Sequence, residues 1–289
     1  MSVHKTILII LYATGFLFAL MVAAKGLGYY VLPIGQRPFS GLHRTLKPGG
    51  LWGHGLGILG SSMLLLLFLY SARKRNVLGL RFGKMSYWLN IHIFLGIMGP
   101  VFVTLHTAFK FGGIVSVSYF SMIAVMLSGF IGRYLYVQIP RTLSGDKLTI
   151  REIDEKDKLM TRVLVEEHGV NPKLLARIQT IAGLGSKDAK GFALLWLLAK
   201  NDLTRRSKLR ALRKQLLKKN RNLPAQKIDR LLALMNEKVL LTRKKALLSS
   251  IQPLFHYWHV AHKPFAYVML IIMFMHVALT ITFGYRWIF

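Results

Sequence analysis

The sequence predicts an all-α integral membrane protein, a five-helix transmembrane bundle with a basic helical cytoplasmic insertion between the fourth and fifth spans. The chain is 53% hydrophobic over 289 residues and has a mean hydropathy of +0.41, which is more apolar than is usual for a soluble protein of this length. Five apolar runs reach or approach the roughly 18 residues that cross a bilayer. All eleven acidic residues lie between Asp146 and Glu237, so none of the five runs contains a carboxylate.

The predicted spans cover about 6–24, 51–71, 87–109, 115–137 and 264–285. The first run follows a short basic start, as a signal peptide does. Its apolar stretch is longer than the usual h-region, so we expect a retained helix. These spans divide the chain into residues 1–137 with four spans, an insertion at 138–252, and residues 253–289 with the fifth span.

The basic residues predict the orientation of the chain. Lys and Arg number 40 against 11 acids; five of them lie in the loop 72–84, and 26 lie in the segment 138–252. By the positive-inside rule, that loop, the N-terminus and the insertion face the cytoplasm, and we expect a bacterial inner membrane. Spans three and five then run from inside to outside. Without an intramembrane carboxylate, a proton-relay transporter is disfavoured.

Several cofactor classes are excluded by what the sequence lacks. There is no cysteine, which removes thiolate metal sites, Fe–S clusters and covalently attached haem. There is also no Walker A loop and no G-x-G-x-x-G motif, so no nucleotide or flavin site is predicted.

Two pairs of histidines share one spacing. His92 and His106 lie fourteen residues apart in the third span, and His262 and His276 lie fourteen apart in the fifth. Fourteen residues rise about 21 Å and complete nearly four turns, so each pair lies on one helix face. Two parallel helices would place His92 with His262 and His106 with His276. Such facing imidazoles predict axial ligation of two haem b groups, with Gly99 letting a porphyrin edge approach the backbone.

The alternative is that these histidines pack or hydrogen-bond between helices. His54 lies at about the depth of His106, and it could be a ligand, a propionate or quinone contact, or a helix contact. His259 could replace His262, although its separation from His276 breaks the repeat. Candidate partners for haem propionates, by predicted depth alone, are Arg44, Lys47, Lys84, Lys110, Arg133, Lys263 and Arg286.

The paired histidines resemble the di-haem core of ferric reductase and NADPH oxidase membrane domains and of quinol-oxidising cytochromes b. The stretches "SGFIGRYLYVQIPRTLSGDKLT" at 128–149 and "HRTLKPGGLWGHGLGILG" at 43–60 are also similar to bacterial membrane cytochromes b of that type. The resemblance implies haem ligation by His92, His106, His262 and His276. Ferric reductases and NADPH oxidases usually have six spans and continue into FAD- and NADPH-binding domains, whereas this sequence shows five spans and no such domain.

The insertion is predicted to be helical. A Thr149-x-x-Glu152 capping box marks one helix start. Basic stretches at about 202–220 and 224–250 indicate an antiparallel hairpin, with Leu209, Leu212 and Leu216 forming its apolar stripe. The run "KDAKGFALLWLLAK" begins after Ser186, a candidate cap, and either lies in the membrane interface or packs inside the insertion. The basicity fits anionic lipid or an acidic redox partner; nucleic acid is disfavoured.

The sequence therefore predicts a membrane oxidoreductase component that transfers electrons between a quinone or a partner reductase and an acceptor on the other side. An alternative is a haem-bearing anchor subunit of a larger dehydrogenase complex. Another is a haem-free transporter or scaffold. Membrane lipid is an expected partner, and both homo- and hetero-oligomers are compatible with the sequence.

Overall fold

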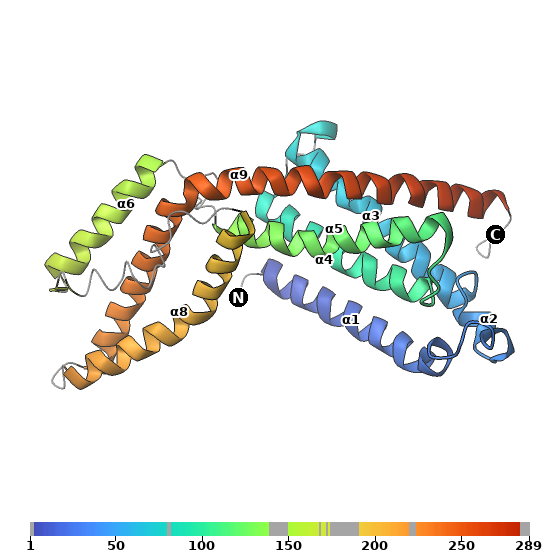
Figure 1. Cartoon of the computed structure of the whole chain (residues 1–289), viewed down its shortest axis with the longest axis horizontal. Coiled ribbons are helices and arrows are strands. Elements are labelled where there is room, and N and C mark those ends of the chain that lie inside the picture. The colour runs from blue at the N-terminus through green and yellow to red at the C-terminus, as the bar shows by residue number, and fades with distance from the viewer. Residues whose placement is uncertain are drawn as a thin grey trace. The chain divides into compact units, whose positions relative to one another are not determined.

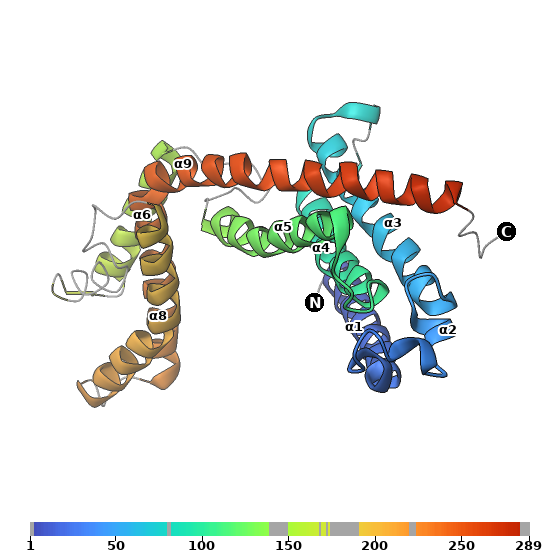
Figure 2. The same ribbon diagram turned by 45° about the vertical axis from the view of Figure 1, so that its right-hand side comes forward.

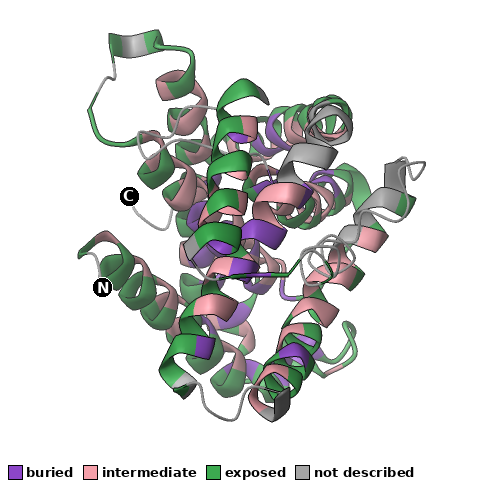
Figure 3. Cartoon of the chain, turned by 90° about the vertical axis from the view of Figure 1, so that its left-hand side faces the viewer, coloured by how far each residue is buried: buried purple, intermediate pink, exposed green. Residues whose placement is uncertain are grey.

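The computed structural model describes residues 3–79, 82–138, 150–167, 169–171, 173, 191–219 and 224–283. These residues are overwhelmingly helical and include no strand. Five helical segments are long and apolar enough to cross a membrane: Val3–Tyr30, His43–Lys74, Met85–His106, Gly113–Gln138 and Pro253–Thr282. Buried residues are a minority in each of these segments, and the others are intermediate or exposed within the chain. Figure 3 colours the described residues by these three classes. For the described residues, the prediction of an all-helical chain with five helices long and apolar enough to cross a membrane is confirmed.

The chain forms two compact units, and their boundaries lie close to the predicted ends of the insertion. Unit 1 comprises Met1–Arg133 and Trp258–Phe289, and unit 2 comprises Tyr134–Tyr257. Figure 1 follows the helices of both units by colour along the sequence. The predicted cap residues Thr149 and Ser186 and the candidate cation Arg286 lie outside the described residues.

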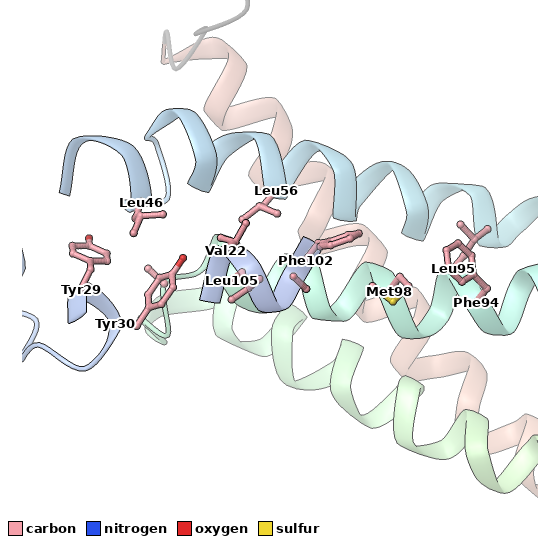
Figure 4. Packing of buried hydrophobic residues seen from close by; sticks show 12 residues of the cluster. Val22, Tyr29, Tyr30, Leu46, Leu56, Phe94, Leu95, Met98, Phe102 and Leu105 are labelled. Carbon is pink, nitrogen blue, oxygen red and sulfur yellow. The ribbon is translucent and has the colours of Figure 1, made fainter. Parts of the chain in front are cut away.

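Unit 1 is built around the contact between two spans. Its helices are α1 (Val3–Tyr30), α2 (His43–Leu46), α3 (Leu51–Lys74), α4 (Met85–His106), most of α5 (Gly113–Gln138) and the last part of α9 (Ala225–Thr282), with 3-10 turns at Arg37–Phe39 and Val77–Gly79. α4 packs most extensively on α3 and also contacts α1 (Figure 2). Figure 4 shows the resulting core, in which Met98 is fully buried among side chains of all three helices.

Glycines set the distance between α3 and α4. A Cβ atom on Gly60 would come within 2.7 Å of a Val103 methyl group and 3.0 Å of the Gly99 carbonyl oxygen. A Cβ on Gly99 would in turn approach the Leu64 side chain at 3.2 Å. Small residues allow two membrane helices to come this close, and the packing then supplies their association energy. Gly99 therefore faces α3, and the expectation that it lets a porphyrin edge approach the backbone stays a prediction.

The C-terminal end of α4 is fixed by a buried arginine. The helix ends where Ala108 and Phe109 adopt left-handed backbone conformations. Arg37, from the loop after α1, donates hydrogen bonds to the carbonyl oxygens of Ala108 at 2.6 Å and Tyr30 at 2.8 Å. Carbonyl groups at a helix end need such partners, so Arg37 joins the ends of α1 and α4.

Unit 2 contains the predicted basic hairpin. α8 (Gly191–Lys219) and the start of α9 pair through Arg213 and Asp229, 2.6 Å apart, and Leu212 packs with Met235 and Val239 in the core. A shorter helix, α6 (Ile150–Arg162), continues into a wider turn at Val163–Glu167. Two boundaries differ from prediction: the run "GFALLWLLAK" is the first part of α8, and α9 continues unbroken from the insertion into the fifth span.

Two buried ion pairs join the helices of unit 2. Arg243 on α9 is 3% exposed and binds Asp202 of α8 at 2.7 Å. The Tyr134 hydroxyl donates to the same carboxylate at 2.8 Å. Lys238 on α9 binds Asp157 of α6 at 2.7 Å and donates to the Thr161 hydroxyl. Burial alone would raise the pKa of Asp202, but the hydrogen bonds from Arg243 and Tyr134 outweigh it, and the pKa lies below its usual range.

We expect Gly60→Ala to destabilise unit 1 by about 1–3 kcal/mol, because the added methyl group overpacks the α3–α4 contact. Gly129→Ala is the matched control, because nothing lies within 4 Å of its added Cβ atom and alanine favours a helix more than glycine does. Thermal unfolding of both variants in lipid nanodiscs checks this. Equal midpoints for the two variants would contradict the assignment of Gly60 to the contact.

We expect Asp202→Asn to destabilise unit 2 by about 2 kcal/mol at neutral pH, because Arg243 is left buried without its counter-charge. The depressed pKa of Asp202 means that this contribution is present at neutral pH and is lost on acidification. The difference between wild type and variant should therefore shrink below about pH 4. Hydrogen exchange of the α8 backbone amides measures this difference in stability between wild type and variant. Asp229→Asn, in an exposed pair, should leave this protection unchanged.

Candidate functional site

The structure brings the predicted histidines together in unit 1 at two levels. The rings of His106 on α4 and His276 on α9 have centroids 6.3 Å apart and are inclined at 62°. At the other level, His92 on α4 and His262 on α9 are close enough to interact electrostatically. The two helices therefore run in the same direction through this region, with the pairing that the fourteen-residue repeats predict.

The separation of His106 and His276 suits two ligands of one metal. A metal–nitrogen bond is about 2 Å long, and the ring centroid lies roughly 1 Å beyond the nitrogen. Two imidazoles on opposite sides of one metal therefore have centroids about 6 Å apart. Stacked or edge-packed rings also reach this separation, so the distance permits shared ligation without requiring it.

Hydrogen bonds fix the tautomers of both histidines on α4. The Nδ1 atom of His106 lies 2.8 Å from the Gly53 carbonyl oxygen, and that of His92 lies 3.2 Å from the Leu67 carbonyl oxygen. A carbonyl oxygen only accepts hydrogen bonds, so each Nδ1 carries the hydrogen. Each neutral ring then keeps an unprotonated Nε2. A backbone carbonyl on the other ring nitrogen is the usual support of a metal-binding histidine.

His262 on α9 has the same tautomer for a different reason. Its Nδ1 lies 2.6 Å from the Ser128 hydroxyl, and that hydroxyl donates its single hydrogen to the Val125 carbonyl oxygen at 2.8 Å. With that hydrogen directed at Val125, Ser128 accepts from Nδ1–H of His262, which leaves Nε2 with its lone pair. Trp258 completes this arrangement by donating to the Ser128 carbonyl oxygen at 2.7 Å and packing its ring 4.8 Å from that of His262.

Sequence reasoning missed the groups that orient the histidines. Ser128 and Trp258 received no role, and Gly57 and Gly132 gave no sign of theirs. A Cβ atom on Gly57 would lie 2.6 Å from Nδ1 of His106, and one on Gly132 would collide with the Trp258 ring. The available signal was the spacing of Ser128 and Gly132 by one helical turn, which places them on one face of α5.

A layer of apolar side chains separates the two levels. Met269 lies seven residues from both His262 and His276 and is buried with Leu64, Met122 and Met273. Ser118 on α5 donates a hydrogen bond to the Met269 carbonyl oxygen at 2.8 Å. The buried members of this layer are all leucine or methionine side chains, so the two levels are distinct polar positions separated by apolar packing.

The remaining histidines fall into separate surroundings. His54 on α3 is close enough to interact electrostatically with both His106 and His276, so it belongs to their level, as expected. His259 packs edge-on against Trp258 at 4.5 Å. His43 lies 3.0 Å from the Tyr29 hydroxyl, and His4 stacks on Tyr87.

The predicted cations lie at exposed positions. Among the described residues, these are Arg44, Lys47, Lys84, Lys110, Arg133 and Lys263. No group of three or more metal-ligating side chains occurs in the part of the chain that the structure describes. A three- or four-ligand zinc site is therefore not formed there, whereas a group that needs two axial histidines is compatible with each level.

The fold and site are those of a helical chain with five helices of membrane-crossing length and two levels of paired histidines, three of which have a hydrogen-bonded Nδ1 atom. No protein-family model, curated protein or solved structure matches the chain. The functional assignment consequently depends on the site itself.

Proposed function

We propose that this protein is a di-haem b-type cytochrome that moves electrons across a membrane. Three of the four paired histidines are held in the Nδ1–H tautomer by bonds to Gly53, Leu67 and Ser128, and this observation carries the proposal. Histidines that only pack between helices have no need of a common tautomer. A shared tautomer with Nε2 unprotonated is what axial ligation demands.

The residues of each level fit a b-type haem. At each level the two histidines would hold the haem iron, and the absence of cysteine from the sequence agrees with a group held without covalent attachment. When bound, each haem would supply a one-electron ferric–ferrous couple. The protein holds the ligands in place, excludes water with the Met269 layer, and offers exposed cations for anionic propionates.

The two levels suggest how the chain connects the membrane surfaces. Fourteen residues of rise separate them by about 21 Å, so each level lies nearer one surface than the other. With both axial positions filled, electrons would enter and leave at the porphyrin edge, without substrate binding to iron. We propose a quinone or a separate reductase subunit as donor on one side, because the sequence shows no flavin or nucleotide motif.

The charge distribution supports an orientation and a compartment. The loop 72–84 and the insertion carry the excess of Lys and Arg, which favours a cytoplasmic location for both and for the N-terminus. We propose the bacterial inner membrane on this basis. A role as the haem-bearing anchor subunit of a dehydrogenase complex uses the same site, and co-purifying flavin or Fe–S subunits would identify it.

We expect the purified protein to bind two low-spin b haems per chain. His106→Ala and His276→Ala should each remove the same haem, and His92→Ala and His262→Ala should each remove the other, because each pair supplies both ligands of one iron. Reduced-minus-oxidised spectra and pyridine haemochrome counts measure this.

His54→Ala is the control. It should retain two haems, since His54 interacts with His106 and His276 without being needed as a ligand. Loss of one haem from the His54→Ala variant would show that His54 is a ligand. Loss of different haems in His106→Ala and His276→Ala would contradict the pairing. A folded but colourless protein, expressed with haem available, would overturn the proposal and favour a haem-free scaffold or transporter.

We expect Ser128→Ala to change only the haem held by His92 and His262. Without its acceptor, Nδ1–H loses the hydrogen bond that raises imidazole basicity, so the midpoint potential of this haem should rise while that of the other stays constant. Potentiometric titration measures both. Ser128→Thr keeps the hydroxyl and should restore the wild-type value. Equal shifts at both haems would show a general packing effect instead.

A further inference from the structure

One face of α8 in unit 2 is exposed along its length and carries both apolar and basic side chains. The six residues Trp196, Lys200, Leu203, Ser207, Arg210 and Lys214 recur at alternating intervals of four and three, so they form a single stripe, the outer face of α8. All six are exposed. Trp196 is 72% and Leu203 82% exposed, which are high values for large apolar side chains.

The core of unit 2 lies against the opposite side of this helix. Leu212 is buried and Leu216 packs beside it, and both lie roughly half a turn away from the outer face. The exposure of Trp196 and Leu203 therefore follows from the way the helix packs. The run "GFALLWLLAK" thus presents part of its apolar surface outward.

The outer face carries only positive charge. α8 contains nine Lys and Arg residues and one acid, Asp202. Asp202 lies on the inner side, in the ion pair with Arg243. The face therefore combines two apolar side chains towards its start with cations along its length, and none of its six residues is acidic.

We propose that the outer face of α8 binds the anionic surface of the membrane that holds the spans. Trp196 and Leu203 would enter the headgroup region, where tryptophan is favoured. Lys200, Arg210 and Lys214 would contact lipid phosphates. Because unit 2 is joined to spans at both ends, lipid is always at high effective concentration, so individually weak contacts suffice.

Single-cysteine variants test this surface, because the chain has no native cysteine. Leu203→Cys in the full chain is labelled with an environment-sensitive fluorophore and placed in nanodiscs of phosphatidylcholine with or without phosphatidylglycerol. We expect a blue shift and several-fold protection from an aqueous quencher only with the anionic lipid, weakened by high salt. Gln226→Cys, at an exposed position on α9, should stay accessible in both.

Charge reversal provides the matched comparison. Lys200→Glu with Arg210→Glu should abolish the protection of the label, whereas Lys227→Glu with Arg230→Glu makes the same change in net charge at exposed positions on α9 and should preserve it. A label equally accessible in both lipids overturns the proposal. A label protected even in lipid-free detergent also overturns it and shows that protein covers this face. These outcomes do not depend on haem content, so they are separable from the test of the proposed function.

Discussion

The close approach of α3 and α4 is the constraint on which the rest of unit 1 depends. Gly57 and Gly60 leave room for the His106 ring and the Val103 backbone, so α4 comes within hydrogen-bonding reach of α3 carbonyl groups. Carbonyl groups inside a helix already accept one bond, and their second lone pair remains for His92 and His106. In an apolar medium, this hydrogen bond gives the buried imidazole N–H an acceptor and so avoids the free-energy cost of leaving it unpaired. The contact thus stabilises the bundle and orients two of the four histidines.

The partner helix α9 is held differently. Its histidine His262 is oriented by side chains, Ser128 and Trp258, and its middle is tethered by Ser118 and packed by methionines. Methionine adapts its shape to irregular space. The histidines of α4 are therefore oriented by backbone carbonyl groups, whereas His262 of α9 is oriented by side chains that can adjust. This difference would suit a protein that binds a large rigid group between two helices, because the α4 side would set the position of the group and the α9 side would adapt to it.

Much of the fold was predictable because membrane composition and helix periodicity are properties of local sequence. The five spans and the placement of His92, His106, His262 and His276 follow from run length and from a spacing of nearly four turns. The contact of Gly99 with α3 could not be predicted, because one sequence does not show which neighbour a helix face meets. The roles of Ser128 and Gly57 were missed for the same reason. The uninterrupted α9 was missed because prolines such as Pro253 favour a helix boundary, yet a proline inside a helix is tolerated where its neighbours adjust.

The charge of unit 2 is better understood by where its acids are than by how many bases it has. Among the described residues, Asp157 and Asp202 are used in buried pairs that hold α6 and α8 to α9. Asp229, Glu155 and Asp154 are paired with neighbouring bases at the surface. These acidic side chains are therefore paired with bases inside unit 2, and most of its described Lys and Arg side chains remain at the surface without an acidic partner in these pairs. Most Lys and Arg residues lie in the loop 72–84 and the segment 138–252, and we propose that this excess both orients the chain in the membrane and attracts anionic lipid. Orientation and surface binding are then two consequences of a single asymmetry in the sequence.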